Sequence, residues 1–218
     1  MKHQAVVDYT IENYYNYCSD FTFSLQKERN KILPPGFTLC HLNKKNKVIF
    51  MHIDKCASTS IGYAFALSNN FRDLSTTKNA TSLKQFFIEN NYQFYAVIRE
   101  PKSRYVSGLQ EFIKLHNPLI DDVVYNLENN KFIFDEHTAP QHCFLFLCEN
   151  KCNYLKLDSN LSNKISLIVN EKVILTNENS SIPSIKKLST SLFENYCKNN
   201  DQFYKLYELD FELYRNSK

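Results

Sequence analysis

The sequence contains no tryptophan, only three glycines and no long apolar run. A helix that crosses a membrane needs about 20 consecutive apolar residues, so the sequence predicts no membrane span. The N-terminal residues MKHQAVVDYTIENYYNY lack the continuous apolar segment and the small-residue cleavage site of a secretory signal. We therefore expect a cytoplasmic protein that is not exported.

An excess of one charge and regularly spaced cysteines are also missing. The 26 basic and 23 acidic residues are scattered along the chain and give a net charge of +3, so we expect no nucleic-acid partner. The seven cysteines are an odd number without the spacing of a disulfide framework, which indicates reduced thiols. The group His142, Cys143, Cys148 and Cys152 lacks the spacing of zinc ligands, so we expect no metal site.

Arginine is scarce, because only five of the 26 basic residues are arginine. Two of the five, Arg99 and Arg104, lie within one six-residue segment. The planar guanidinium group suits bidentate binding of oxyanions better than a lysine ammonium does. This clustering in a lysine-rich chain therefore indicates a binding site for an oxyanion.

What the sequence does contain is typical of a globular protein: 218 residues, 43% hydrophobic and 14% aromatic. We expect one main domain over residues 37–218, preceded by an N-terminal extension, residues 1–36, that packs on it. Short apolar segments alternate with amphipathic ones, which predicts an α/β fold with a central parallel sheet flanked by helices. The predicted strands are 47–53, 93–98, 153–157 and 172–175, and the predicted helices are 59–69, 82–90, 103–116, 119–129, 139–148, 159–169, 183–198 and 201–214.

A first strand–loop–helix segment, KVIFMHIDKCASTSIGYAF, covers residues 47–65. Lys55 follows the strand, and small or hydroxylated residues lead into the helix. Such side chains let an anion approach the backbone amides of the first helical turn, which have no partners inside the helix. The alternative is that Ser58 and Thr59 only cap the helix. The loop of ordinary kinases and ATPases has the form GxxxxGK[ST], and here no glycine precedes the lysine, which argues against those classes.

A second segment of the same kind, FYAVIREPKSRYVSGLQEF, covers residues 94–112. Arg99 comes directly after the apolar strand, and Ser107 lies one helical turn beyond Arg104 on a face that they share. The carboxyl ends of parallel strands lie at the same edge of a sheet. We therefore expect the two loops to converge on one anionic ligand.

These two segments resemble motifs of the sulfotransferases. HIDKCASTSI is similar to their 5′-phosphosulfate loop, which often reads HIPKTGGTSI or IPKTASTSF, and VIREPKSRYVSGL is similar to their 3′-phosphate motif, VRDPxxRxxSxY. Weaker similarities link DEHTAPQHCFL to a DxHxxPQxxFL segment, YLKLD to a strand that ends in an acid, TNENSS to an HxNxS segment, and YELDFELY to a closing YxxDFxxY helix. The resemblance is to the membrane-type or carbohydrate branch, covers about residues 37–215, and implies a three-layer fold like that of the P-loop NTPases.

The resemblance implies that 3′-phosphoadenosine 5′-phosphosulfate (PAPS) donates a sulfuryl group to a hydroxyl or amine of an acceptor, a small molecule or a carbohydrate. Carried over by position, Lys55 would contact the bridging and sulfate oxygens, and Arg99 and Ser107 would bind the 3′-phosphate. An ammonium group at that place would stabilise the charge that grows on the leaving oxygen. The residues that would line the 5′-phosphate are Ala57, Ser58, Thr59 and Ser60.

Two residues of the first loop depart from the family pattern. Asp54 replaces the usual proline, and its charge beside Lys55 is expected to weaken the attraction for an anion. Cys56 replaces a common threonine. A cysteine at a helix N-terminus beside a lysine can have a lowered pKa and act as a nucleophile, but anion binding explains the position more simply.

The base that takes the acceptor's proton is expected to be His137, which matches the histidine of the DxHxxPQ pattern. Its alternative role is structural, tying a loop to a helix. Asp73 is the second candidate for the base, because it lies between the two loops. His52 is expected to support its loop, and His116 to lie on the acceptor side.

Two other functions stay open from the sequence. One is a kinase on the same architecture, against which the glycine-poor first loop argues. The other is a binding module that keeps the nucleotide contacts but has no catalytic activity, which Asp54 and the uncertain base leave open.

Overall fold

The computed structural model describes residues 38–67, 71–75, 80–145, 148, 151–176 and 182–218. The predicted N-terminal extension, residues 1–36, lies outside the described residues, and so does most of the TNENSS segment. The strands are β1 (Thr38–Asn43), β2 (Val48–Met51), β3 (Phe71–Ser75), β4 (Gln93–Ile98) and β5 (Cys152–Lys156).

The strands form a mixed sheet in the order β3-β1-β2-β4-β5, so the fold is α/β but the sheet is not wholly parallel. β2, β4 and β5 are parallel, as predicted, whereas β1 is antiparallel to both β2 and β3. β1 and β3 were not predicted. The first lies before the motif segments in sequence, and FRDLS of β3 has too few apolar residues to show alternation.

Three other predicted elements differ from the structure. The helix predicted over 139–148 is reduced to a short 3-10 helix, η1. Residues 172–175 form no strand, because the amides of Val173 and Leu175 donate to the hydroxyls of Ser166 and Ser162 rather than to a sheet. The helix predicted over 201–214 is divided in two at Tyr207.

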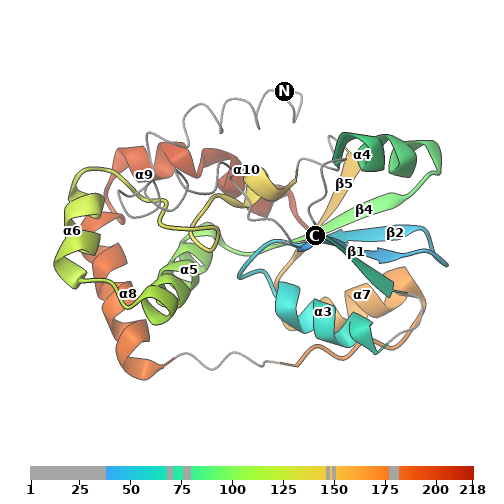
Figure 1. Cartoon of the computed structure of the whole chain (residues 1–218), viewed down its shortest axis with the longest axis horizontal. Coiled ribbons are helices and arrows are strands. Elements are labelled where there is room, and N and C mark those ends of the chain that lie inside the picture. Colours follow the sequence, from blue (N-terminus) through green and yellow to red (C-terminus); the bar gives the residue numbers. More distant parts are fainter. Residues whose placement is uncertain (1–37, 68–70, 76–79, 146–147, 149–150, 177–181) are drawn as a thin grey trace.

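The helices of the described residues cover both sides of the sheet and extend beyond it. Figure 1 shows α3 and α7 on one side and α4 and α10 on the other, while α5, α6, α8 and α9 gather at the end of the sheet. The helices are α3 (Ser58–Ala66), α4 (Ala80–Glu89), α5 (Pro101–His116), α6 (Ile120–Glu128), η1 (Gln141–Phe144), α7 (Leu161–Val169), α8 (Pro183–Tyr196), α9 (Asp201–Leu206) and α10 (Glu208–Asn216).

Two hydrophobic cores hold these elements together. The first surrounds the sheet and includes Phe50, Phe65 and Phe94, and the second lies among α5, α6, α8 and α9 and includes Tyr105 and Phe203. Leu206 packs against both cores. Because α5 belongs to the second core and follows β4 of the first, the loop before α5 lies where the cores meet.

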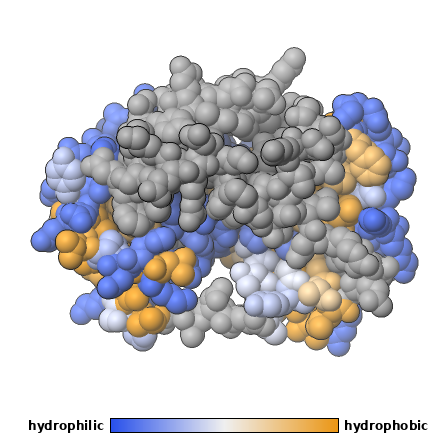
Figure 2. Space-filling view, in the orientation of Figure 1, coloured by the Kyte–Doolittle hydropathy of each residue, from blue (hydrophilic) through white to orange (hydrophobic). Residues whose placement is uncertain are grey.

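Among the described residues, no helix combines the length and the apolarity that a membrane crossing requires. Exposed large apolar side chains are dispersed, with Leu119 just before α6, Phe86 in α4 and Leu167 in α7. Figure 2 shows hydrophilic residues over most of the described part of this face, with hydrophobic residues in separate groups. Single exposed apolar residues of this kind are ordinary in folded proteins.

Candidate functional site

The first loop joins β2 to α3 and has a strained backbone. Lys55 and Ala57 adopt left-handed conformations, with φ of 64° and 62°. That conformation costs a residue with a Cβ atom roughly 1–2 kcal/mol, and such strain is concentrated at functional sites. Left-handed residues in a turn can also bring successive amide groups to one side, where they bind anions.

The N-terminus of α3 has no side-chain cap. Its N-cap position is Ala57, whose side chain makes no hydrogen bond to the helix. Ser58 begins the helix and is buried, and Ser60 Oγ donates instead to Thr176 O at 2.7 Å. The alternative that Ser58 and Thr59 only cap this helix is therefore wrong, since neither occupies the cap position.

The second loop, between β4 and α5, differs from the first at the start of its helix. Glu100 is the N-cap of α5, and its carboxylate accepts hydrogen bonds from the amides of Lys102 at 3.3 Å and Ser103 at 2.7 Å. Pro101, at the first helical position, has no amide hydrogen. The carboxylate of Glu100 thus already accepts the hydrogen bonds of the first-turn amides of α5. An anion at this loop therefore has to be bound by side chains.

The two clustered arginines have different surroundings. Arg99 lies at the open side of the loop, where its Nη1 donates to Lys55 O at 3.2 Å. Arg104 is buried, and its Nε donates to Asp54 O at 2.9 Å and its Nη1 to Ala139 O. Arg99 is therefore the arginine that an oxyanion can reach, and Arg104 links the first loop to the segment before η1.

The two loops line one pocket with a volume of about 520 Å³, a size that suits a small ligand. The residues predicted to bind the donor and the first candidate for the base, His137, all contribute to its lining, although they come from three separate parts of the chain. The predicted residues in the lining are Lys55, Ala57, Ser58, Thr59, Ser60, Arg99, Ser107 and His137, and the others are Asp54, Gln110, Glu111, Leu157 and Lys186.

A second hollow, of about 660 Å³, adjoins this pocket. The two share Ala57, Ser60, Arg99 and Leu157 in their linings. The second extends toward the C-terminal part of the chain, where Tyr214 of α10 lines it. An elongated ligand could therefore lie across Arg99 with one end at Lys55.

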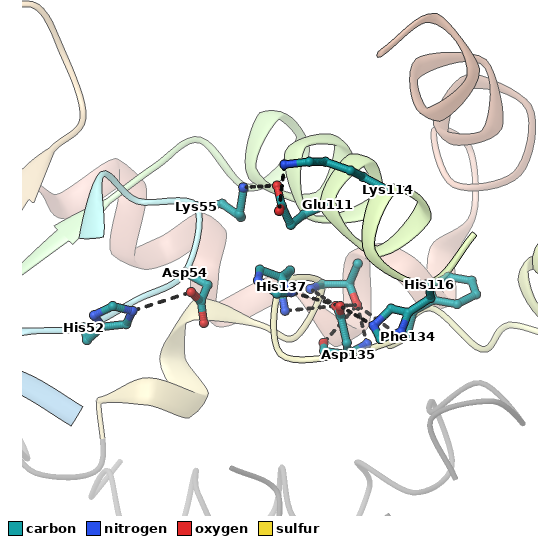
Figure 3. Close-up of polar contacts among 10 residues, drawn as sticks. His52, Asp54, Lys55, Glu111, Lys114, His116, Phe134, Asp135 and His137 are labelled. Carbon is teal, nitrogen blue, oxygen red and sulfur yellow. Dashed lines mark hydrogen bonds and ion pairs between the residues drawn. The ribbon is translucent and has the colours of Figure 1, made fainter. Parts of the chain in front are cut away.

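His137 is held by the carboxylate of Asp135. Its Nδ1 lies 2.9 Å from Asp135 Oδ2, and its backbone amide donates to Asp135 Oδ1 at 3.0 Å. Burial lowers the pKa of His137, but the hydrogen bond to Asp135 and the charges of Asp135, Asp54 and Glu136 outweigh burial and raise it. Since Nδ1 is engaged with Asp135, Nε2 is the nitrogen that can take up a proton. Figure 3 shows His137 between Asp54 and Asp135.

Gly108 lets the segment that carries His137 approach α5 closely. A Cβ atom at this position would lie 2.1 Å from the backbone oxygen of His137, a separation that no side chain can occupy. On the other side of the segment, the hydroxyl of Tyr207 donates to Thr138 O. His137 is thus positioned by contacts with α5 and with the C-terminal part of the chain.

Lys55 is paired with Glu111, a residue that was not predicted. Lys55 Nζ lies 3.2 Å from Glu111 Oε2, and Lys114 Nζ lies 3.4 Å from the other carboxylate oxygen (Figure 3). Burial raises the pKa of Glu111, but the two ammonium groups outweigh burial and lower it, so the group is a carboxylate at neutral pH. Glu111 lies one helical turn beyond Ser107, and this spacing is the sequence signal that could have identified it.

Gln141 joins the two loops from the inside. Its side chain is completely buried, and its amide group bonds both backbone groups of Arg99, accepting from N and donating to O, each at 2.9 Å. Its Oε1 also accepts from Cys56 Sγ at 3.1 Å. The backbone amides of Gln141 and His142 in turn donate to the carboxylate of Asp210 in α10. The segments DEHTAPQHCFL, which contains Gln141, and YELDFELY, which contains Asp210, therefore meet behind the two loops.

The sequence suggested that the charge of Asp54 acts on Lys55, but the carboxylate of Asp54 is turned toward His52. Its Oδ1 lies 3.5 Å from His52 Nε2, and its backbone oxygen accepts from Arg104. Although burial raises the pKa of Asp54, the hydrogen bond to His52 and the charges of His52, His137 and Arg104 lower it. His52 supports the loop as expected, and the carboxylate that pairs with Lys55 is Glu111 instead.

Two alternative roles proposed from the sequence lack support in the structure. Asp73 lies in the edge strand β3, paired with His41 and so level with Phe50 inside β2, rather than beyond the carboxyl end of β2 where Lys55 lies. Cys56 is buried, and burial raises the pKa of its thiol to about 11. The cysteine is therefore a protonated structural group and not a nucleophile.

One group of acidic and histidine side chains has the spacing that a metal ion would need. In the part of the chain that the structure describes, the ligand atoms of Asp135, Glu136 and His137 lie within 4.8 Å of one another. Asp135 and His137 are, however, hydrogen-bonded to each other. His142, which the sequence placed in a possible zinc group, has its Nδ1 2.8 Å from Asp210.

Comparisons with protein-family models, with curated proteins and with solved structures gave no match to this chain.

Proposed function

We propose that this protein is a sulfotransferase that moves a sulfuryl group from PAPS to a hydroxyl or amine of an acceptor, a small molecule or a carbohydrate. Within this proposal, the fold is a variant of the three-layer P-loop NTPase architecture in which one strand, β1, runs antiparallel to the others and lies between β2 and the edge strand β3. The observation that carries the proposal is that residues from both motif loops and His137 line one pocket together.

The first loop supplies the groups that suit the sulfate-bearing end of PAPS. α3 presents first-turn amides without a side-chain cap, and Lys55 adds an ammonium group beside them. Negative charge grows on the bridging oxygen as its bond to sulfur breaks, and positive groups fixed at that place stabilise the transition state more than the ground state. Lys55 is therefore assigned to the bridging and sulfate oxygens.

The second loop supplies side chains for the 3′-phosphate, the group that distinguishes PAPS from ATP. Glu100 fills the amides of α5, so Arg99 and Ser107, which both line the pocket, are the groups left for this phosphate. A guanidinium group and a hydroxyl are suitable donors for a phosphate. The adjoining hollow beyond Arg99 offers space for the nucleoside.

His137 is assigned as the base. The acceptor's oxygen or nitrogen forms a bond to sulfur, the bond from sulfur to the bridging oxygen breaks with its electron pair going to that oxygen, and His137 Nε2 takes the acceptor's proton. Asp135 holds the imidazole through Nδ1 and stabilises the imidazolium that results. The other product is adenosine 3′,5′-bisphosphate.

Thermal-shift titration tests this assignment. We expect adenosine 3′,5′-bisphosphate to raise the melting temperature more than ADP or ATP does at equal concentration, because only the first carries a phosphate for Arg99 and Ser107. Arg99→Ala should lose most of this preference, while Lys102→Ala, three residues further on in the first turn of α5 but outside the pocket lining, should keep it.

The same titration separates the alternatives. Stronger stabilisation by ATP would favour a kinase and contradict the proposal. Stabilisation by the bisphosphate without release of sulfate from labelled PAPS, to water or to any acceptor in a screen of sugars, amines and phenols, would favour a binding module without catalytic activity.

A further inference from the structure

The ammonium group of Lys55 has a carboxylate beside it before any ligand arrives. Glu111 Oε2 lies 3.2 Å from Lys55 Nζ. The exposed fraction of the side chain is 22% for Glu111 and 13% for Lys55, so both are largely shielded from water. Lys114, which pairs with the other oxygen of Glu111, is about half exposed. A ligand that binds Lys55 therefore meets the negative charge of Glu111 at short range.

The effect of this charge depends on the charge of the ligand group. A terminal sulfuryl group carries one negative charge, whereas a terminal phosphoryl group carries up to two above its second pKa of about 6. The two groups have nearly the same shape and the same oxygens. Repulsion from a fixed carboxylate grows in proportion to the ligand's charge, so it disfavours the phosphoryl group more.

The other charged groups around the pocket do not cancel this difference. Lys55 and Glu111 together carry no net charge, and Asp54, which is turned toward His52, adds a negative one. Arg99 is assigned to the 3′-phosphate, which ligands of both kinds carry, and His137 is held by Asp135. Lys186 of α8 lines the pocket but is exposed, where water screens its charge. Glu111 is thus the carboxylate in direct contact with the cation assigned to the transferred group.

We propose that Glu111 is a specificity-determining residue that makes the pocket prefer a singly charged sulfuryl end over a doubly charged phosphoryl end at Lys55. This inference rests on the proposed function, because that function assigns the transferred group to Lys55. It gives the protein a means of rejecting phosphorylated nucleotides of the same shape. Glu111 is not assigned as a second base, since two ammonium groups already bind its oxygens.

A pair of isosteric ligands tests the inference. PAPS and adenosine 3′-phosphate 5′-diphosphate differ only in the terminal group, sulfuryl or phosphoryl. We expect the wild type at pH 8, without divalent cations, to bind PAPS about tenfold more tightly by calorimetry. In Glu111→Gln both ligands should bind more tightly, and the ratio of their dissociation constants should fall to about one.

Lys114→Gln is the matched control, because it changes the other partner of Glu111 and leaves the carboxylate and Lys55 in place. It should keep the wild-type preference. An unchanged ratio in Glu111→Gln, or equal binding of the two ligands by the wild type, overturns this inference alone. Binding of neither ligand, nor of adenosine 3′,5′-bisphosphate, by the wild type overturns the proposed function and the inference with it.

Discussion

The carboxylate of Asp135 determines what the imidazole of His137 can do. It fixes the ring through Nδ1 and, with Asp54 and Glu136, raises the pKa of the histidine above its ordinary value of about 6.5. A base must be neutral to accept a proton. The neutral fraction increases with pH through the pKa, so the rate of transfer should increase over a pH range that lies above 6.5.

Asp135→Asn is predicted to move this increase to lower pH. The asparagine removes the negative charge that stabilises the imidazolium, so the pKa of His137 falls toward its ordinary value. The plateau rate should also fall about tenfold or more, because the ring is held less firmly. The measurement is the pH profile of single-turnover sulfate release from bound labelled PAPS.

His137→Asn is the control at the same position, since it has no group that titrates in this range. Its slow residual release should be independent of pH between about 6 and 9. A wild-type rate in His137→Asn, or an identical pH profile in Asp135→Asn, would show that another residue takes the proton.

At the scale of the elements, α5 is both a wall of the pocket and the support for the segment of His137. Gly108→Ala is predicted to destabilise the protein by about 2 kcal/mol. Alanine would ordinarily stabilise a helix by about 1 kcal/mol relative to glycine. Here its Cβ would lie 2.1 Å from His137 O, so the segment has to move. Transfer should fall more than nucleotide binding, measured by single turnover and thermal shift.

Gly62→Ala in α3 is the matched control. Its nearest contact would be 3.2 Å from the ring of His41, a separation that a small shift of the ring can relieve. We expect unchanged or increased stability there. Equal effects of the two substitutions would contradict the importance of the close contact at Gly108.

Gln141 connects elements that are distant in sequence, and its loss should affect both loops. Gln141→Leu is predicted to lower the free energy of unfolding by about 3 kcal/mol, because Arg99 N and O and the Cys56 thiol lose their buried partner. The affinity for adenosine 3′,5′-bisphosphate should also fall at least tenfold. Urea unfolding and calorimetry measure the two effects.

The control for this change is Gln202→Leu, on the exposed side of α9. It should leave stability and affinity nearly unchanged. Wild-type nucleotide affinity in a folded Gln141→Leu variant would show that the contact serves stability alone.

At the scale of the whole molecule, a buried histidine links α10 to η1 and makes stability depend on pH. Burial alone would lower the pKa of His142, but Cys143 and the hydrogen bond to Asp210 raise it to about 10. A raised pKa means that the protonated form stabilises the fold. This stabilisation is complete below the unfolded pKa of about 6.5 and is lost as pH rises toward 10.

We therefore predict that the free energy of unfolding decreases from pH 7 to pH 9.5, by up to about 3 kcal/mol. Urea unfolding midpoints at a series of pH values measure the decrease. The His142→Asn variant should be less stable than the wild type at pH 7, and its free energy of unfolding should vary less with pH. If the free energy of unfolding of this variant decreased with pH as steeply as that of the wild type, other groups would be responsible for the decrease.

The two motif loops could be predicted from the sequence because their signals are local. An apolar strand, a cationic loop and an amphipathic helix follow one another at Lys55 and again at Arg99, and parallel strands bring such loops to one edge. The placement of His137 at the same pocket followed from a resemblance, and its contact with Asp135 lies within three residues of chain.

Other features depend on contacts between distant residues and could not be predicted. The pairing of β1 with β3 needs the partner strand to be known, and the amides of residues 172–175 find hydroxyls on α7 rather than a strand. Glu111 faces Lys55 only because of how α5 is placed against the first loop. The roles of Gln141 and Arg104 likewise depend on burial.

The left-handed backbone at residues 55 and 57 limits which sequences can form the same loop. Glycine and asparagine adopt this conformation readily, and valine, isoleucine and threonine do not. Related chains should therefore vary at position 57 among glycine, asparagine and other small residues while avoiding branched ones. A set of orthologous sequences in which valine or isoleucine is common at position 57 would mean that the loop has a different conformation there.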